Sequence, residues 1–311
     1  MSAVPLLEAR KVGFRYGRNS CLFKGLDLTL HEGEFLAVVG PSGCGKTSLL
    51  KILGGFLTPG SGTVYRQGLP VQSPSPHAVM VFQEFDQLFP WKRVWSNVAF
   101  PLKAGEERTG GWQIGGKKSL SKDPAAADPS EKKGQERLKE IDRRVEEILR
   151  EVGLYEFRRY FPYQLSGGMK QRTALARSLV SRPPILLMDE PFGSLDAQKR
   201  EELQGLLLRM WDEHGFSVVF VTHDISEALV LADRIMVMRL PEEKAGEEGG
   251  PGTVAAGGRG PCASDDSVQS IFLDIDLPRP RVPQSPVFRE YYRRIFRLLG
   301  QEGGDDRDSS Q

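Results

Sequence analysis

Nine residues, Gly40-Pro41-Ser42-Gly43-Cys44-Gly45-Lys46-Thr47-Ser48, have the types and spacing of a phosphate-binding loop, G-x-x-x-x-G-K-[ST]. Glycines let the backbone curl tightly, so that successive N–H groups point at one anion. Lys46 can reach the β- and γ-phosphates, the Thr47 hydroxyl can ligate Mg²⁺, and Ser48 offers a hydroxyl to the α-phosphate. The predicted nucleotide contacts are Gly40, Ser42, Gly43, Cys44, Gly45, Lys46, Thr47 and Ser48.

The segments on either side of this loop have the pattern that its chemistry needs. Residues 35–39 are an uninterrupted apolar run, which predicts a buried strand that ends at the loop. Residues 48–53 continue as a predicted helix, whose N-terminus near Gly45 would add the positive end of its dipole. A chance match to the motif would lack this strand–loop–helix setting.

Four polar residues follow other apolar strands and could contribute to the same site. Gln83 ends one such strand, Asp189 and Glu190 end a second, and His223 follows a third. Sites in parallel sheets form where the carboxyl ends of strands meet, so we expect these side chains beside the phosphate loop.

An aromatic residue, Tyr16, ends an alternating strand near the N-terminus. Its ring could stack on adenine, or it could pack against the sheet, and its position alone favours neither interpretation.

Composition excludes several classes of protein. The chain has 311 residues and a formal net charge of +1, without the basic excess typical of a general nucleic-acid binder. No apolar run approaches the roughly 20 residues that span a bilayer. The 3 cysteines are scattered without metal-ligand spacing, which favours a reducing cytoplasm.

The order of predicted elements indicates an α/β fold. Strands and helices alternate after residue 137, which predicts a mainly parallel sheet covered by helices. The predicted organisation is a nucleotide-binding domain over 4–240, with a helical subdomain at about 84–182 that contains a flexible insertion at 104–136. It is followed by a flexible linker over 241–267, a C-terminal extension with a helix over 268–300, and a disordered tail over 301–311.

These motifs together resemble the ATP-binding subunit of ABC transporters. The matching pieces, in the family's order, are the loop at 40–48, Gln83, Leu165-Ser166-Gly167-Gly168-Met169, residues 185–191, Ser194-Leu195-Asp196 and His223. The resemblance implies a P-loop NTPase core with a mainly parallel sheet, an N-terminal antiparallel β subdomain and an α-helical signature subdomain. The chain departs from the family's pattern at Met169, where many relatives have Gln. This difference leaves the Ser-Gly-Gly segment, which would contact an anion, unchanged.

The resemblance implies ATP and Mg²⁺ as cofactors and assigns catalytic and metal-binding roles. Glu190 would orient or deprotonate the attacking water, and His223 would contact the γ-phosphate. Asp189 would hold the Mg²⁺ shell together with Thr47. Gln83 would also ligate Mg²⁺ and report its presence to the membrane partner.

The resemblance also implies a head-to-tail dimer of two copies of the chain. Ser166, Gly167 and Gly168 sit at a predicted helix N-terminus, which is an anion site. They would close over the γ-phosphate held by the second copy, and Asp196 would communicate between the two shared sites.

Two segments, Val81–Trp91 and Leu277–Arg281, look like those of nitrate, sulfonate and taurine importers. The chain would then hydrolyse ATP to power import of a small solute, such as one of these anions, from the cytoplasmic face of the inner membrane. Permease subunits would bind at Phe85–Trp95, and a periplasmic or extracellular solute-binding protein would take part indirectly. The same aromatic residues could instead be core.

Two other functions are less well supported by the sequence. A soluble ABC ATPase acting on nucleic acid or ribosomes usually has a long coiled coil or two ATPase units, whereas this chain has one unit and no heptads. We therefore expect no nucleic-acid partner. A nucleotide sensor that does not hydrolyse ATP is disfavoured by intact Glu190 and His223. The C-terminal helix could pack on its own domain or bind a membrane surface.

Overall fold

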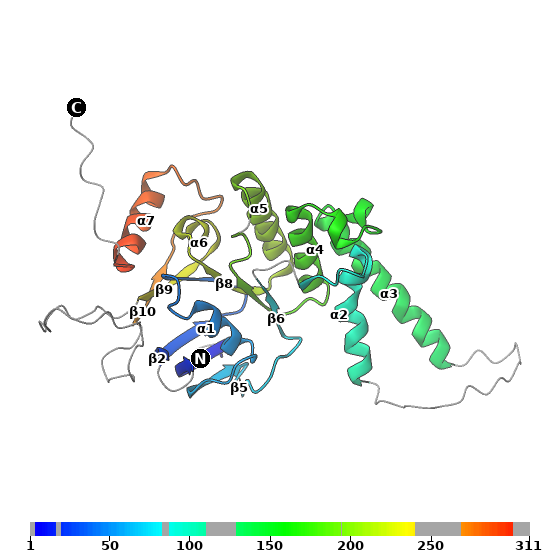
Figure 1. Cartoon of the computed structure of the whole chain (residues 1–311), viewed down its shortest axis with the longest axis horizontal. Coiled ribbons are helices and arrows are strands. Elements are labelled where there is room, and N and C mark those ends of the chain that lie inside the picture. Colours follow the sequence, from blue (N-terminus) through cyan, green and yellow to red (C-terminus); the bar gives the residue numbers. More distant parts are fainter. Residues whose placement is uncertain are drawn as a thin grey trace, which may run out of the picture. The chain divides into compact units, whose positions relative to one another are not determined.

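The structure, a computed structural model, describes residues 4–16, 20–82, 87–109, 129–193, 195–239 and 269–300 (Figure 1). The chain forms two compact units. The first comprises residues 1–80, 184–190 and 208–311, and the second comprises residues 81–183 and 191–207. The predicted sites or segments that lie outside the described residues are Gln83, Phe85, Ser194, most of the insertion, the linker and the tail.

A six-stranded sheet, in the order β10-β9-β3-β8-β7-β6, forms the centre of the first unit. Its strands are β3 (Phe35–Val39), β6 (Ala78–Val81), β7 (Ile185–Asp189), β8 (Ser217–Thr222), β9 (Arg234–Arg239) and β10 (Gln269–Asp274). β3 runs parallel to β8 and β9, and β7 runs parallel to β8, whereas β10 is antiparallel to β9. Every residue of β3, β7 and β8 is buried, which explains their continuous apolar sequences.

The register of this sheet aligns the strand ends that carry the predicted site. Val39, the last residue before the phosphate loop, lies opposite Thr222 of β8. Asp189, the last residue of β7, lies opposite Val221. Parallel pairing therefore brings three functional segments, far apart in the sequence, to one edge.

A second, antiparallel sheet in the first unit has the order β2-β1-β4-β5. Its strands are β1 (Leu7–Tyr16), β2 (Ser20–Leu30), β4 (Ser61–Arg66) and β5 (Leu69–Pro70). Apolar side chains from this sheet, from helix α1 (Lys46–Leu53) and from the larger sheet share one core cluster. The predicted combination of a mainly parallel sheet with an N-terminal antiparallel sheet is confirmed.

The second unit is helical, as predicted. It contains α2 (Val94–Thr109), α3 (Pro129–Glu151), two 3₁₀ turns (Tyr155–Phe157 and Pro162–Gln164) and α4 (Gly167–Leu179), together with the first half of α5 (Ala197–His214). α3 buries Ile141, Val145, Ile148 and Leu149, which lie on one face of the helix, whereas Leu138 is exposed.

The predicted insertion at 104–136 is too long at both ends. α2 continues to Thr109 and α3 begins at Pro129 (Figure 1). These ends are rich in Ala, Glu, Lys and Arg, which favour helix without giving an apolar periodicity. Polar composition therefore does not by itself distinguish a helix from an irregular segment.

The C-terminal helix α7 (Pro286–Leu298) packs on its own unit, which was the first of the two alternatives. It buries Phe288 and Ile295 and lies against α6 (Ile225–Leu231) and β9 (Figure 1). Within the described residues, no helix combines the length and apolar character that crossing a bilayer requires.

Replacing Ser285 with alanine is expected to lower the free energy of unfolding by about 1 kcal/mol. Its hydroxyl caps α7 by accepting a hydrogen bond from the Phe288 N–H at 3.3 Å, and alanine leaves that donor unpaired. Urea denaturation measures the change, and Ser285→Asn, which keeps a cap, should restore most of the loss. Equal losses for both variants would contradict the capping role.

Candidate active site

The phosphate loop joins β3 to α1 with two glycines in the left-handed region. Gly43 has a φ of 79° and Gly45 a φ of 103°, and α1 begins at the next residue, Lys46. A Cβ atom on Gly45 would lie 2.9 Å from the Phe23 ring. Backbone angle and packing therefore both require glycine here, which leaves the backbone N–H groups free to turn toward an anion.

The side chain of Lys46 is held over this loop. It is 6% exposed, and its Nζ donates to the carbonyl oxygens of Gly40 and Pro41 at 2.8 and 3.0 Å. An ammonium group in this position can exchange these neutral acceptors for phosphate oxygens, which form stronger, charge-assisted hydrogen bonds.

Cys44, also placed among the nucleotide contacts, turns its side chain into the core. It is fully buried in the apolar cluster beneath the loop, and burial raises the pKa of its thiol. Only the backbone of Cys44 is therefore suited to a phosphate, and its side chain anchors the loop to the core.

Thr47 and Asp189, the two described members of the predicted metal set, are in contact. Thr47 Oγ1 donates to Asp189 Oδ1 at 3.0 Å. Asp189 is 5% exposed, and burial raises the pKa of its carboxyl, partly offset by the Thr47 hydrogen bond. Two oxygen ligands, one of them a poorly solvated carboxylate that a cation would stabilise, fit the preferences of Mg²⁺.

Glu190 and His223 face each other from neighbouring strand ends. The His223 Nδ1 lies 3.0 Å from the Glu190 Oε2. Glu190 has a φ of 43°, which is uncommon for a residue with a side chain, and its N–H donates to the Val221 carbonyl at 2.9 Å. Backbone strain of this kind occurs at functional sites, where the fold holds a side chain in a required direction.

Tyr16 lies on the surface beside the loop. Its side chain is 52% exposed, its hydroxyl is 3.3 Å from Ser48 Oγ, and its ring packs edge-to-face on Phe14 at 4.9 Å. The ring is therefore not buried in the sheet, and an open aromatic face near the loop is available for stacking.

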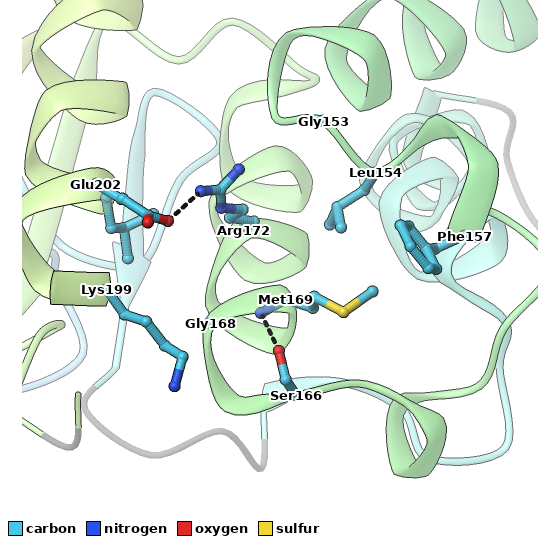
Figure 2. Close-up of a pocket in the computed structure, with 10 residues that line it drawn as sticks. Gly153, Leu154, Phe157, Ser166, Gly168, Met169, Arg172, Lys199 and Glu202 are labelled. Atoms are coloured by element: carbon cyan, nitrogen blue, oxygen red, sulfur yellow. Dashed lines mark hydrogen bonds and ion pairs between the residues drawn. The ribbon is translucent and has the colours of Figure 1, made fainter. Parts of the chain in front are cut away.

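The Ser166-Gly167-Gly168 motif lies in the helical unit, at the N-terminus of α4. Ser166 caps this helix by accepting from the Met169 N–H at 3.4 Å. A cavity of about 170 Å³ opens beside it. Figure 2 shows the Met169 side chain extending toward Phe157, with Lys199 on the other side of the motif.

Comparison with known proteins identifies the family. Residues 23–193, more than half of the chain, match the ABC transporter family. This chain belongs to the ABC transporter family. The nitrate import ATP-binding protein of Synechococcus elongatus is 43% identical over 91% of this chain and 86% of its own length. An aliphatic sulfonates import ATP-binding protein of Agrobacterium fabrum is 39% identical, over 89% of this chain and 78% of its own.

A solved ATP-binding cassette, described as a dimer in a post-hydrolysis state with ADP and phosphate, has the same fold. It matches with a TM-score of 0.57 and 31% identity, over 74% of this chain and 93% of that chain. The predicted family, the fold class and ATPase activity coupled to transport are therefore confirmed, and this ABC ATPase binds ATP as its family does.

Asp196, predicted to communicate between sites, has a clear local role in this ABC ATPase. Its Oδ1 accepts from the Lys199 N–H at 3.0 Å and so caps α5, and its Oδ2 pairs with Lys199 Nζ at 2.5 Å. The bond to Lys199 holds the pKa of Asp196 below its usual range.

Sequence reasoning missed two residues near the predicted site. Lys199 lines the cavity beside Gly168 (Figure 2). Its spacing of three from Asp196 at a helix start was the available signal. Glu227 is buried and accepts a hydrogen bond from Thr222 Oγ1 at 2.7 Å. Its position three residues after the Asp224 cap was the available signal.

Proposed function

We propose that this chain is the ATP-hydrolysing subunit of a membrane importer for a small anion. The observation that carries the proposal is the pairing of Glu190 with His223 at the same sheet edge as the phosphate loop and the Thr47–Asp189 pair. Relatives named for nitrate and for aliphatic sulfonates support an anion as cargo, such as nitrate, a sulfonate or taurine.

In the proposed mechanism, the chain binds and positions rather than forming covalent bonds. The loop N–H groups and Lys46 hold the phosphates, and Tyr16 stacks on the adenine. Glu190 orients the attacking water and takes up its proton, while His223 fixes the Glu190 carboxylate. Thr47 and Asp189 would hold Mg²⁺, which when bound neutralises charge on the phosphates. Gln83 remains a proposed further ligand.

Two copies of the chain would form the active unit. The helix N-terminus at Ser166-Gly167-Gly168 offers N–H groups and a positive dipole end, which suit the γ-phosphate held by the partner subunit. The solved dimeric cassette supports this arrangement. Asp196, as the cap of α5, would transmit the state of one site to the other.

The proposed permease contact is narrower than Phe85–Trp95. Leu88 and Val94 are buried, and Phe89 packs between Phe100 and the Arg177 guanidinium. Trp91, in contrast, is 70% exposed. A large exposed aromatic side chain is typical of a binding surface, so Trp91 is the residue we assign to the permease.

Replacing Trp91 with serine is expected to weaken association with the permease at least tenfold and to leave ATP affinity unchanged. Co-purification in mild detergent and nucleotide titration measure the two effects. Leu69→Ser, at an equally exposed apolar residue of the other unit, is the matched control and should retain the permease. Loss of ATP binding in Trp91→Ser would instead show that the substitution disturbs the fold, and would contradict a role confined to the permease contact.

Gentle detergent purification from native membranes, with mass spectrometry of the partners, tests the proposal as a whole. We expect a polytopic permease and a solute-binding protein, and the chain itself on the cytoplasmic face of the membrane. Recovery of only soluble or ribosomal partners would overturn the importer.

A further inference from the structure

The helix that follows His223 is short and is anchored at its N-terminus. α6 has 7 residues, which is too short for a helix to be stable by itself. Asp224 Oδ1 accepts hydrogen bonds from two N–H groups of its first turn, at 2.7 and 3.3 Å. The Glu227 carboxylate accepts from Thr222 Oγ1 at the end of β8. These bonds tie the first turn of α6 to the strand end that carries His223.

The C-terminus of α6 is held by an arginine from far along the chain. Arg281 Nη1 donates to the carbonyl oxygens of Leu229 and Ala232 at 2.7 and 2.5 Å. Its Nε and Nη2 donate to Leu277 and Ile275, at 2.9 and 3.3 Å. The last carbonyls of a helix lack partners within the helix, and a cation there complements the helix dipole.

A second arginine reinforces this attachment. Arg279 donates to the Leu231 carbonyl at 2.5 Å and pairs with Asp233 at 2.8 Å. Its guanidinium also lies 4.6 Å from the centre of the Trp211 ring in α5. Residues 275–281 therefore hold the last turn of α6 through two side chains, which donate three hydrogen bonds to the carbonyl oxygens of Leu229, Leu231 and Ala232.

The environment of Arg281 shows that this attachment is specific. Its guanidinium is half-buried, and burial lowers its pKa to about 10. A desolvated charge is unfavourable unless its hydrogen bonds are satisfied, and here the four acceptors are backbone carbonyls on two separate segments. Residues 275–281 and the last turn of α6 must therefore be in place together.

We propose that residues 275–281 form a clamp on α6 that positions His223 against Glu190, with Arg281 as the central positioning residue. The inference rests on the proposed function, in which His223 fixes the catalytic carboxylate. His223 directly precedes the Asp224 cap, so a tilt of α6 displaces its ring. A hydrogen bond of 3.0 Å does not survive a displacement of about 1 Å.

The test compares Arg281→Gln and Arg281→Lys with Arg289→Gln, each in the full chain with and without His223→Ala. Arg289 is exposed on α7 and serves as the matched control. Steady-state hydrolysis of Mg-ATP gives kcat and KM, nucleotide titration gives the ATP affinity, and hydrogen exchange follows the α6 amides.

Arg281→Gln is expected to lower kcat roughly tenfold or more, because small misplacement of catalytic groups has large effects on rate. ATP affinity should stay within about twofold, and the α6 amides should exchange faster. Arg281→Lys should be intermediate, since one ammonium cannot serve four carbonyls on two segments. With His223→Ala present, Arg281→Gln should have no further effect, and Arg289→Gln should resemble the unmodified chain throughout.

Several results would overturn the clamp. An unchanged kcat in Arg281→Gln, or an equal loss with and without His223, would show that Arg281 does not act through His223. If Arg281→Gln fails to fold, Arg281→Lys carries the same comparison. If the ATP hydrolysis rate is unchanged in both Glu190→Gln and His223→Ala, the proposed hydrolysis mechanism is wrong, and the clamp has no catalytic pair to position. If the rate falls in those two variants but not in Arg281→Gln, only the clamp is wrong.

Discussion

Glu190→Gln is expected to reduce ATP hydrolysis by about 10²-fold or more and to change ATP affinity by less than a few-fold. Glutamine keeps the size of the side chain and its hydrogen bond toward His223, but its amide cannot accept the proton of the attacking water. Because Glu190 directly follows β7 and does not lie in the phosphate loop, we expect nucleotide binding not to depend on its charge. Single-turnover phosphate release and nucleotide titration separate the two quantities.

The matched control is Glu32→Gln, which neutralises an exposed carboxylate in the turn before β3. It should hydrolyse ATP at the unmodified rate. A Glu190→Gln rate equal to that of the control would remove Glu190 from the mechanism. A loss of ATP binding in Glu190→Gln would show that the carboxylate supports the loop instead.

Lys46→Ala is expected to weaken ATP binding by about 10²-fold or more. Charge-assisted hydrogen bonds contribute about 1.5–3 kcal/mol each, and two such bonds to phosphate oxygens account for an effect of this size. The lysine is buried over the loop, and its ammonium group donates to the neutral carbonyl oxygens of Gly40 and Pro41, so its charge is available to a ligand. Isothermal titration with ATP measures the loss.

Lys24→Ala, at an exposed lysine of β2, is the control and should bind ATP normally. Because Lys46 also bonds to the loop carbonyls, thermal unfolding must show that Lys46→Ala remains folded before its affinity is interpreted. A folded Lys46→Ala protein with unchanged ATP affinity would place the phosphates somewhere other than this loop.

Local patterns were sufficient for the parts of the site that lie at strand ends. The strands β3, β7 and β8 are buried on both faces and are therefore apolar throughout. An uninterrupted apolar run can be recognised as a buried strand from the sequence alone. Once the strands are parallel, their carboxyl ends must share one edge, which is why Asp189, Glu190 and His223 could be assigned together with the loop. Polar helices gave no such pattern, and the ends of α2 and α3 were missed for that reason.

Side-chain direction could not be obtained in the same way. The loop motif placed Cys44 among the nucleotide contacts, but its side chain belongs to the core, because the curl of the loop turns that position inward. Position alone left two interpretations of Tyr16 open, and its exposure beside Ser48 was set by the pairing of β1 within its sheet.

The sequence by itself determined the phosphate loop, the α/β class, the family and the strand-end residues, because these depend on short segments with a fixed period or spacing. Only the tertiary structure decided that Arg279 and Arg281 hold the carbonyl oxygens at the end of α6, since those partners lie about 50 residues earlier and are backbone atoms, which carry no side-chain signal. Backbone acceptors are present at every position, and the fold alone selects among them.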